Sequence, residues 1–307
     1  MEENLSKKIV KSDLKSQYDQ NVKSILSEKI ILAYILKQVT REFKDADIEE
    51  IKEKYIEDIE NEGSIIIGQN SEDIEDGKVV YDIVFSANVP NKQEKIKLII
   101  NIEAQKDDKQ GYELVTRGQY YGARLISSQK GRIFDKSNYQ KLQKVYSIWI
   151  CMNANKAKRN SMNVYQNIET NIIGNYQAKK EDYDLINVII LYLDISKEGE
   201  EKNIIDFLGL LLSDKIKAEE KVKKLRQEYE IKTDVNFERK VDEMCNLGQG
   251  IEDRALERGI IQGKAKGENK ILSLISKMIS NGEGDKVEQI TTDVKLREQL
   301  FKKYHIE

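Results

Sequence analysis

The sequence predicts a mixed α/β protein, because segments with the period of a β-strand lie between segments with the period of a helix. The clearest β signal is a pair of alternating segments, residues 78–88 and 95–105, joined by a turn that contains Pro90. Residues 21–42 and 111–130 instead place apolar side chains three or four positions apart, as amphipathic helices do. Pro90 is the single proline of the chain, which favours long helices with few breaks.

The other elements follow from the same two periods. The segment at 185–195 is nearly all apolar, so we expect it to be a strand inside the sheet. The remaining predicted elements are, in chain order, a polar lead-in (1–20), a helix (48–60), a short strand (64–68), an acidic loop (69–77), a strand (144–152) and helices from residue 203 onward.

We divide the chain into a main domain, residues 21–245, and a helical tail, residues 246–307. Within the main domain the sheet core covers about 63–195 and a helical part covers 203–245. In the tail, glycine recurs at every fourth position within a charged helical pattern, and each glycine in a helix costs about 1 kcal/mol relative to alanine. This glycine stripe indicates either close approach of another helix or a frayed segment. Its members are Gly259, Gly263 and Gly267.

The composition excludes several kinds of chemistry. The chain has one histidine, His305, and two cysteines, Cys151 and Cys245, too few for an ordinary zinc site or an imidazole-based triad. Lys and Arg number 51 against 54 Asp and Glu, a net charge of −3. Catalysis would therefore use carboxylates, amides, lysines, tyrosines and a bound metal ion.

The sequence also bears on the compartment. No apolar run approaches the roughly 18 residues of a membrane span, and the first residues lack the features of a signal peptide. Two widely spaced cysteines suit a reducing environment. We expect a cytoplasmic protein with no membrane partner.

Two acidic residues on the predicted hairpin form the candidate site. Each strand has an apolar face and a polar face, and the polar faces include Asp82 and Glu103. A four-residue loop at 91–94 would place Asp82 directly opposite Glu103. Opposed carboxylates repel each other unless a cation lies between them, and oxygen ligands suit Mg²⁺ or Mn²⁺. The backbone carbonyl of Ala104 could supply a further ligand.

The alternative is that Asp82 and Glu103 are ordinary residues on the wet face of a sheet. Two observations favour the metal site. Val84 and Ile99 share that face, so it is not freely solvated, and the helix that follows could cover it.

That following helix carries a candidate phosphate-binding stripe. Arg117, Tyr121 and Arg124 lie one turn apart, arginine binds phosphate with a planar fork, and tyrosine can stack on a nucleotide. The alternative is a pair of solvated arginines beside a core tyrosine. Since the chain is slightly acidic overall, DNA affinity would depend on local patches and fall steeply with salt.

Several ordered stretches together resemble the bacterial PD-(D/E)XK nuclease family transposases, a group related to the Rpn recombination-promoting nucleases. The resemblance covers about residues 20–268. The stretches that carry it are 27–33, 55–57, 80–83, 100–105, 117–129, 145–153 and 244–248.

This resemblance implies a restriction-endonuclease-like core in the order helix, three strands, helix, strand. It implies a Mg²⁺-dependent DNA endonuclease of a mobile-element or recombination family, with Asp82 and Glu103 as metal-binding acids. An acid on the first helix would be Glu28, with Glu57 as the rival. Gln105 stands where the wider superfamily usually has lysine.

The glutamine has a chemical consequence, because an amide can only donate and accept hydrogen bonds, whereas an ammonium also balances phosphate charge. We therefore expect a slow or partner-dependent enzyme. One site cuts one strand, so cutting both strands needs two copies, and the glycine-striped tail is the candidate dimerisation element.

Two alternatives stay open. The chain could be a catalytically weak or inactive nuclease-like module that binds DNA or a protein. A transposase of the three-carboxylate, RNase H-like kind is the other, but close pairing of Asp82 and Glu103 on one hairpin fits that arrangement poorly.

Overall fold

The structure is a computed structural model of the 307-residue chain. Of strand β6, only Ile96 has a described side chain, and the side chains of β2, β3 and β4 are not described. The residues that the structure describes are 16–57, 66–67, 70–71, 79–80, 82–90, 95–103, 112–152, 154–194, 201–213 and 215–306.

The chain forms two compact units, Met1–Gly248 and Gln249–Glu307. The predicted domain boundary at residue 246 lies close to this division. Helix α8, Val235–Ser280, begins in the first unit and ends in the second. None of the helices in the described part of the chain is both long enough and apolar enough to cross a bilayer.

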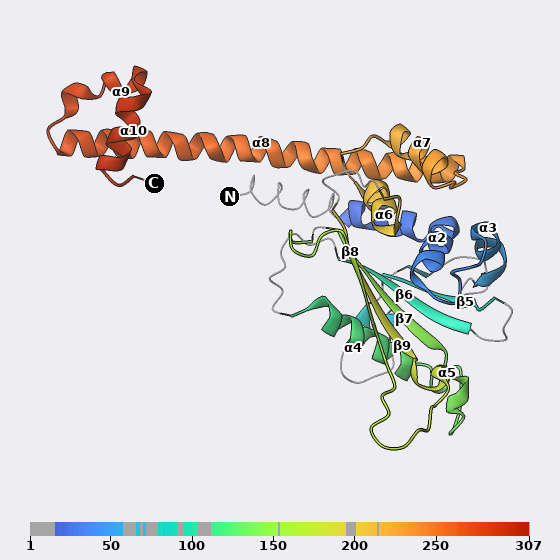
Figure 1. The fold of residues 1–307 in the computed structure, drawn as a ribbon. Helices are drawn as coiled ribbons and strands as arrows, with labels where there is room; N and C mark the ends of the chain where they lie inside the picture. Colours follow the sequence, from blue (N-terminus) through green and yellow to red (C-terminus); the bar gives the residue numbers. More distant parts are fainter. Residues whose placement is uncertain are drawn as a thin grey trace. The chain divides into compact units, whose positions relative to one another are not determined.

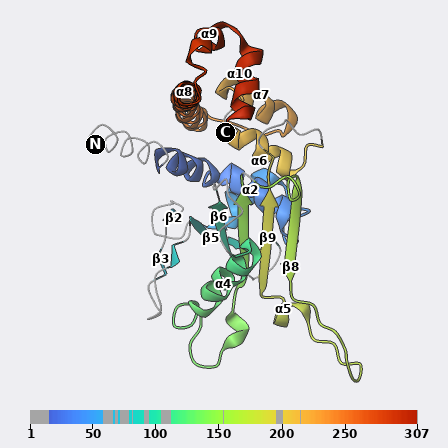
Figure 2. The same cartoon turned by 90° about the vertical axis from the view of Figure 1, so that its left-hand side faces the viewer.

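A mixed sheet forms the centre of the first unit (Figure 2). Strands β6, β7 and β9 are parallel, and the other pairings are antiparallel. β2 (Ile66–Ile67) also pairs with β5, and β3 (Asn70–Ser71) and β4 (Val79–Val80) form a separate ribbon. The sheet order is β1 (Ile56–Glu57), β5 (Ile83–Asn88), β6 (Lys95–Glu103), β7 (Lys144–Cys151), β9 (Ile186–Tyr192) and β8 (Ser161–Gln166).

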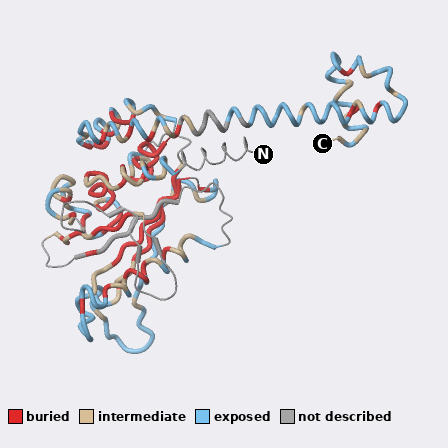
Figure 3. The backbone as a smooth tube through the Cα atoms, turned by 180° about the vertical axis from the view of Figure 1, so that it is seen from behind, coloured by how far each residue is buried: buried red, intermediate tan, exposed pale blue. Residues whose placement is uncertain are grey.

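Helices cover both faces of this sheet (Figure 1). On one face lie α2 (Lys29–Val39) and α6 (Ile204–Leu212), which are buried on nearly every side because their sequences are almost wholly apolar. Alternate strand residues such as Phe85 and Ile148 join them in the main core. Figure 3 shows that burial is concentrated in the strands and in the helices packed on them. The mixed α/β class predicted from the two periods is confirmed.

Helix α4 (Leu114–Ser127) covers the other face and approaches it closely. A Cβ atom added at Gly118 would lie 2.5 Å from Val188 Cγ1 and 2.9 Å from Trp149 Nε1. At Gly122 it would lie 2.8 Å from Ile186 Cγ2. These two glycines, one turn apart, let the helix backbone lie directly on β7 and β9. Glycines with this spacing were predicted to allow close packing in the tail, but not in α4.

The first unit contains further helices. The chain is helical at residues 16–26, before α2. The others are α3 (Ile48–Glu50), the π-helix η1 (Ile51–Tyr55), η2 (Tyr139–Lys141), α5 (Lys180–Tyr183) and α7 (Ala218–Glu228).

Several predictions differ from the structure. The strand predicted at 78–88 is divided, because Val79–Val80 forms β4 in a separate ribbon and β5 begins only at Ile83, and β3 lies inside the predicted acidic loop 69–77. The helix predicted at 21–42 breaks at Glu28, which has an extended backbone, with φ −61° and ψ 129°. The helix predicted at 48–60 ends at Tyr55, because residues 56–57 pair with β5 as β1. Strand β8 was not predicted. Its short, uncharged sequence has no apolar alternation strong enough to distinguish it from a loop.

The second unit contains the end of α8, the short helices η3 (Gly284–Lys286) and α9 (Gln289–Thr292), and α10 (Val294–Lys303). Leu274 and Met278 of α8 pack with residues of the later helices in a small core. The glycine stripe is helical, so the frayed interpretation is wrong. A Cβ added at any of the three stripe glycines would meet no described atom within 4 Å, so no described helix of the second unit approaches the stripe.

Candidate functional site

Asp82 lies immediately before β5, at the edge of the sheet where the parallel strands β6 and β7 end. Open α/β sheets bind ligands at this edge, outside the carboxyl ends of the strands. β5 begins with the pair Ile83–Ile100, and β6 then continues for three residues to Glu103. The end of β6 therefore extends beyond Asp82 along the sheet.

The predicted register of the hairpin is wrong by two residues. Asn88 pairs with Lys95, so six residues separate the two strands instead of four. Pro90 explains the difference, because it has no N–H to donate and the ladder ends before it. Extended by one residue beyond the pair Ile83–Ile100, the observed register places Asp82 opposite residue 101, two positions before Glu103. A rise of about 3.3 Å per residue makes those Cα atoms roughly 8 Å apart, and the side chains must span that separation.

A lysine contacts the candidate metal-binding acid. Lys23 Nζ lies 2.6 Å from Asp82 Oδ1, and the two side chains are 28% and 17% exposed. Lys23 belongs to the helical segment 16–26, far from Asp82 in sequence. This contact is not predictable from the sequence, since no local pattern links a position on the first helix to the start of a distant strand.

Glu103 ends β6 and pairs with Cys151 of β7 in the parallel ladder. Its side chain, and all of Ala104 and Gln105, lie outside the described residues. Their assigned roles therefore stay predictions. Among the side chains that are described, no group of three or more His, Cys, Asp or Glu lies close enough together to hold a metal ion.

Arg117 is held above the same part of the sheet by aromatic rings. Its guanidinium carbon lies 5.2 Å from the ring centroids of both Tyr121 and Trp149, and 5.9 Å from that of Tyr112. Arg117 Nη2 donates to the Tyr121 hydroxyl at 3.1 Å, and Nη1 donates to the Tyr112 hydroxyl at 3.2 Å. Trp149 is the β7 partner of Asn101, so Arg117 lies at the end of β6 that leads to Glu103.

The other two predicted phosphate contacts are less open. Tyr121 is packed edge-on against Trp149, with centroids 5.2 Å apart, so its ring supports Arg117 and is not free to stack on a base. Arg124 is only 7% exposed, with its guanidinium carbon 5.9 Å from the Tyr120 ring. We therefore withdraw Arg124 as a phosphate contact. Tyr112 and Tyr120 are about half exposed and are the available stacking surfaces.

The two candidates for the helix acid occupy different places. Glu57 accepts a hydrogen bond from Asn88 Nδ2 at 2.8 Å and pairs with Ser86, four residues along β5 from Asp82 and so roughly 13 Å away. Glu28 stands before α2, five residues after Lys23, and forms an ion pair with Lys240. The separation of Glu57 from Asp82 disfavours Glu57 and leaves Glu28 as the candidate.

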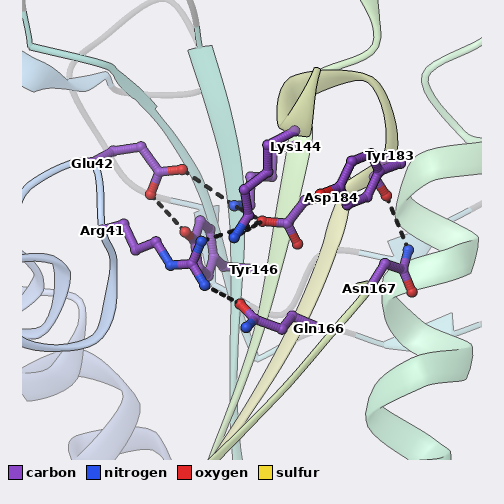
Figure 4. A network of polar contacts seen from close by, with 9 residues as sticks. Arg41, Glu42, Lys144, Tyr146, Gln166, Asn167, Tyr183 and Asp184 are labelled. Atoms are coloured by element: carbon purple, nitrogen blue, oxygen red, sulfur yellow. Dashed lines mark hydrogen bonds and ion pairs between the residues drawn. The ribbon is translucent and has the colours of Figure 1, made fainter. Parts of the chain in front are cut away.

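A second polar cluster lies at the amino ends of the parallel strands (Figure 4). Lys144 Nζ, on the first residue of β7, lies 3.3 Å from Glu42 Oε1 and 3.1 Å from Asp184 Oδ2. Asn187, with its amide oriented to satisfy both neighbours, donates to Asp184 at 3.2 Å and accepts from Lys144 at 2.8 Å. Asp184 and Asn187 are almost fully buried.

Two more side chains complete this amino-end cluster. Tyr146 donates to Glu42 Oε2 at 2.6 Å, and Arg41 contacts Asp184 and Gln166. Burial alone would raise the pKa of Glu42, but the hydrogen bond from Tyr146 and the charge of Lys144 outweigh it and hold the pKa below its usual value. Burial and the neighbouring Glu42 raise the pKa of the Tyr146 hydroxyl. Because the acids and bases are paired with one another, the cluster connects four segments of the fold, and we assign it a structural role.

No family model matches the chain, and neither a curated protein nor a solved structure does. The functional interpretation therefore depends on the residues and their geometry.

Proposed function

We propose that the chain is a divalent-metal-dependent DNA endonuclease with a PD-(D/E)XK-type core. The supporting observation is the arrangement at the carboxyl ends of the parallel strands. There the Asp82 carboxylate lies 2.6 Å from the Lys23 ammonium, and Arg117 is held over β7. Resemblance to the PD-(D/E)XK nuclease family transposases supplies the reaction class. We also propose that this enzyme is cytoplasmic and belongs to a family associated with mobile elements or recombination.

The donor set suits a hard divalent cation. Asp82 offers carboxylate oxygens, and its contact with an ammonium shows that a positive charge is tolerated there. Glu103 and the Ala104 carbonyl would complete an all-oxygen set for Mg²⁺, with Mn²⁺ as a substitute. A bound ion would lower the pKa of an attacking water and polarise the scissile phosphate.

The chain's own residues position the substrate. Arg117 would bind a flanking phosphate, and its orientation is set in advance because two tyrosine hydroxyls accept its N–H groups. Tyr112 and Tyr120 would stack on bases or sugars next to the cut. Gln105 would orient the attacking water, and Glu28 would serve as the helix acid.

Lys23 would supply the site with an ammonium group, which Gln105 cannot do because its side chain is an amide. In the structure it neutralises Asp82, so an incoming divalent ion would have to displace it from that carboxylate. A resident counter-ion of this kind weakens metal binding and agrees with the slow enzyme expected from the glutamine.

Two copies would be needed to cut both strands, and we propose the tail as one pairing element. Leu256 and Ile260 of α8 are 65% and 60% exposed, beside a glycine stripe that no described atom of the second unit covers. A second α8 could approach that stripe closely.

The rival is a nuclease-like module that binds DNA or a protein without cutting. The enclosure of Arg117 by aromatic rings favours it, because an arginine already held by three rings offers fewer free donors to phosphate. Calorimetry with Mg²⁺ separates the two: heat of binding that disappears in Asp82→Ala supports the enzyme, and no heat at millimolar metal supports the module.

The direct test is cleavage of supercoiled plasmid by purified protein with and without Mg²⁺. We expect Asp82→Ala and Glu103→Ala each to lower the nicking rate at least about 100-fold, since even indirect partners of a metal ligand cost 10- to 100-fold. Asp135→Ala, the same substitution at an exposed turn after α4, is the matched control and should retain the parent rate. Equal nicking by Asp82→Ala and the parent would overturn the proposal.

A further inference from the structure

Strand β8 forms one edge of the sheet. Among the described residues it pairs with β9 and with no other strand, so the outer side of its backbone is open to another strand. Figure 2 shows β8 at the border of the sheet, with β9 on one side only. The register with β9 is continuous over all 6 residues, so no bulge turns this edge away from a partner.

The features by which proteins usually protect a sheet edge are missing from β8. Its sequence, from Ser161 to Gln166, has neither a proline nor a charge. Met162 and Val164 on one face are 41% and 48% exposed, and Tyr165 on the other is 37% exposed. The strand at the other end of the sheet, β1, is only 2 residues long. β8 is therefore the edge best suited to pairing with another strand.

The charges that flank β8 indicate which partner fits. Lys156, Lys158 and Arg159 precede the strand, where Lys158 is paired with Glu113 and Arg159 with Asp194, and Glu169 follows the strand. In an antiparallel pair of two β8 strands, the basic flank of one copy lies beside the Glu169 end of the other. The two basic flanks are then as far apart as the strand allows, and no like charges oppose each other at the two-fold axis. A second copy of the chain is thus complementary to this edge.

An apolar loop continues the surface beyond β8. Loop 167–179 is held in shape by polar contacts: both carboxylate oxygens of Glu169 accept from Ala178 N, at 3.1 and 3.2 Å, and Asn167 Nδ2 donates to Tyr183 O at 3.1 Å. Figure 3 shows this loop as exposed. Exposed apolar patches on an ordered segment are typical of a contact surface. Four large side chains there are between 76% and 95% exposed: Ile168, Ile172, Ile173 and Tyr176.

We propose that β8 is a homodimer interface, at which two copies pair their β8 strands antiparallel and continue one sheet across both molecules. Each loop 167–179 then covers the segment before β8 of the partner. This interface consists of β8 and loop 167–179 and is independent of both the nuclease activity and pairing through the tail.

The first test compares Val164→Lys with Val235→Lys in the full chain by sedimentation velocity over a range of concentrations. Both substitutions add a lysine at an exposed valine, but Val235 is 85% exposed at the start of α8, away from the edge. We expect Val164→Lys to weaken self-association by at least about tenfold, because like charges would meet near the axis. Val235→Lys should associate as the parent does.

The second test locates the contact by oxidative cross-linking of Asn163→Cys, Val164→Cys and Tyr165→Cys, each also combined with Leu256→Lys to remove tail pairing. We expect a disulfide-linked dimer, formed fastest by the residue nearest the two-fold axis and unaffected by Leu256→Lys. Absence of cross-linking above the parent background at all three positions would overturn the proposal. So would a dimer that Val164→Lys leaves unchanged, including one lost only with Leu256→Lys.

Discussion

The polar groups at the two ends of the parallel strands β6, β7 and β9 differ in how deeply they are buried and how fully they are paired. At the amino ends, Lys144, Glu42 and Asp184 are bound to one another and to neutral groups, and Asp184 is 3% exposed. At the carboxyl ends, Asp82 forms an ion pair with Lys23, both side chains are partly open to solvent, and Arg117 contacts the half-exposed ring of Tyr112.

The contrast separates polar groups that stabilise the fold from those that can act on a ligand. Buried charges persist when each is paired and hydrogen-bonded, and a carboxylate fully occupied in this way has no free lone pair for a metal. A carboxylate at a solvent-facing sheet edge can exchange its partner. We therefore expect substitutions at the amino ends to affect stability, and substitutions at the carboxyl ends to affect activity.

The largest difference in stability is expected between Asp184→Ala and Asp82→Ala. Removing Asp184 leaves the Lys144 ammonium without one of its two carboxylates in a buried setting, which should lower the free energy of unfolding by about 3 kcal/mol. Asp82→Ala should cost less than about 1 kcal/mol, because its ion pair is partly solvated. Urea titration monitored by circular dichroism measures both. Similar losses for the two variants would show that the two ends do not differ as we infer.

Gly118→Ala tests how α4 carries Arg117 to the site. The added Cβ would lie 2.5 Å from Val188 Cγ1, which is fully buried, so we expect a loss of about 2 kcal/mol and a fall in nicking as α4 shifts. Gly263→Ala in α8 is the control, and it should raise the free energy of unfolding. No described atom lies within 4 Å of the added Cβ, and alanine favours the helix by about 1 kcal/mol. A neutral Gly118→Ala would mean that α4 tolerates displacement.

Tyr146→Phe should lower stability at neutral pH by about 1 kcal/mol, through loss of its hydrogen bond to Glu42. The pKa of Glu42 is lower in the folded protein than in the unfolded chain, so its contribution is complete above the usual carboxyl pKa and is lost as pH falls through the folded value. Without the phenol this pKa rises, and the slope of stability against pH below about pH 5 should decrease. Thermal melts from pH 3 to about pH 7 measure this for the parent and the variant. Parallel curves of stability against pH would show that Tyr146 does not affect the pKa of Glu42.

The smallest effect on stability is expected for Lys23→Met, less than about 1 kcal/mol. The same change should tighten Mn²⁺ binding about two- to fivefold, since the competing ammonium is gone. Calorimetry measures this, with Lys54→Met, which removes an exposed ion pair to Glu50, as the control. Weaker binding by Lys23→Met would show instead that the lysine supports the metal.

Local periodicity was sufficient to predict most of the sheet and the helices, because apolar spacing of two or of three to four residues is a property of neighbours in sequence. The antiparallel pairing of β5 with β6 is confirmed, whereas its register was wrong because Pro90 ends the ladder early. β8 escaped prediction because an edge strand need not be apolar on either face.

The candidate site was predictable only where its residues are close in sequence. Arg117 and Tyr121 were recognised from their spacing, and the structure brings them together. The contact of Lys23 with Asp82 joins distant segments, and the burial of Arg124 depends on how tightly Gly118 and Gly122 let α4 pack. Such long-range packing leaves no signal in one sequence.

The most direct test of a metal site at the carboxyl edge is anomalous scattering from crystals of the full chain soaked in Mn²⁺. We expect one anomalous peak within coordination distance of a carboxylate oxygen of Asp82 and of Glu103, with the Lys23 ammonium moved away. A Mn²⁺ peak at Glu42 and Asp184, or none beside Asp82 at saturating Mn²⁺, would contradict the assignment.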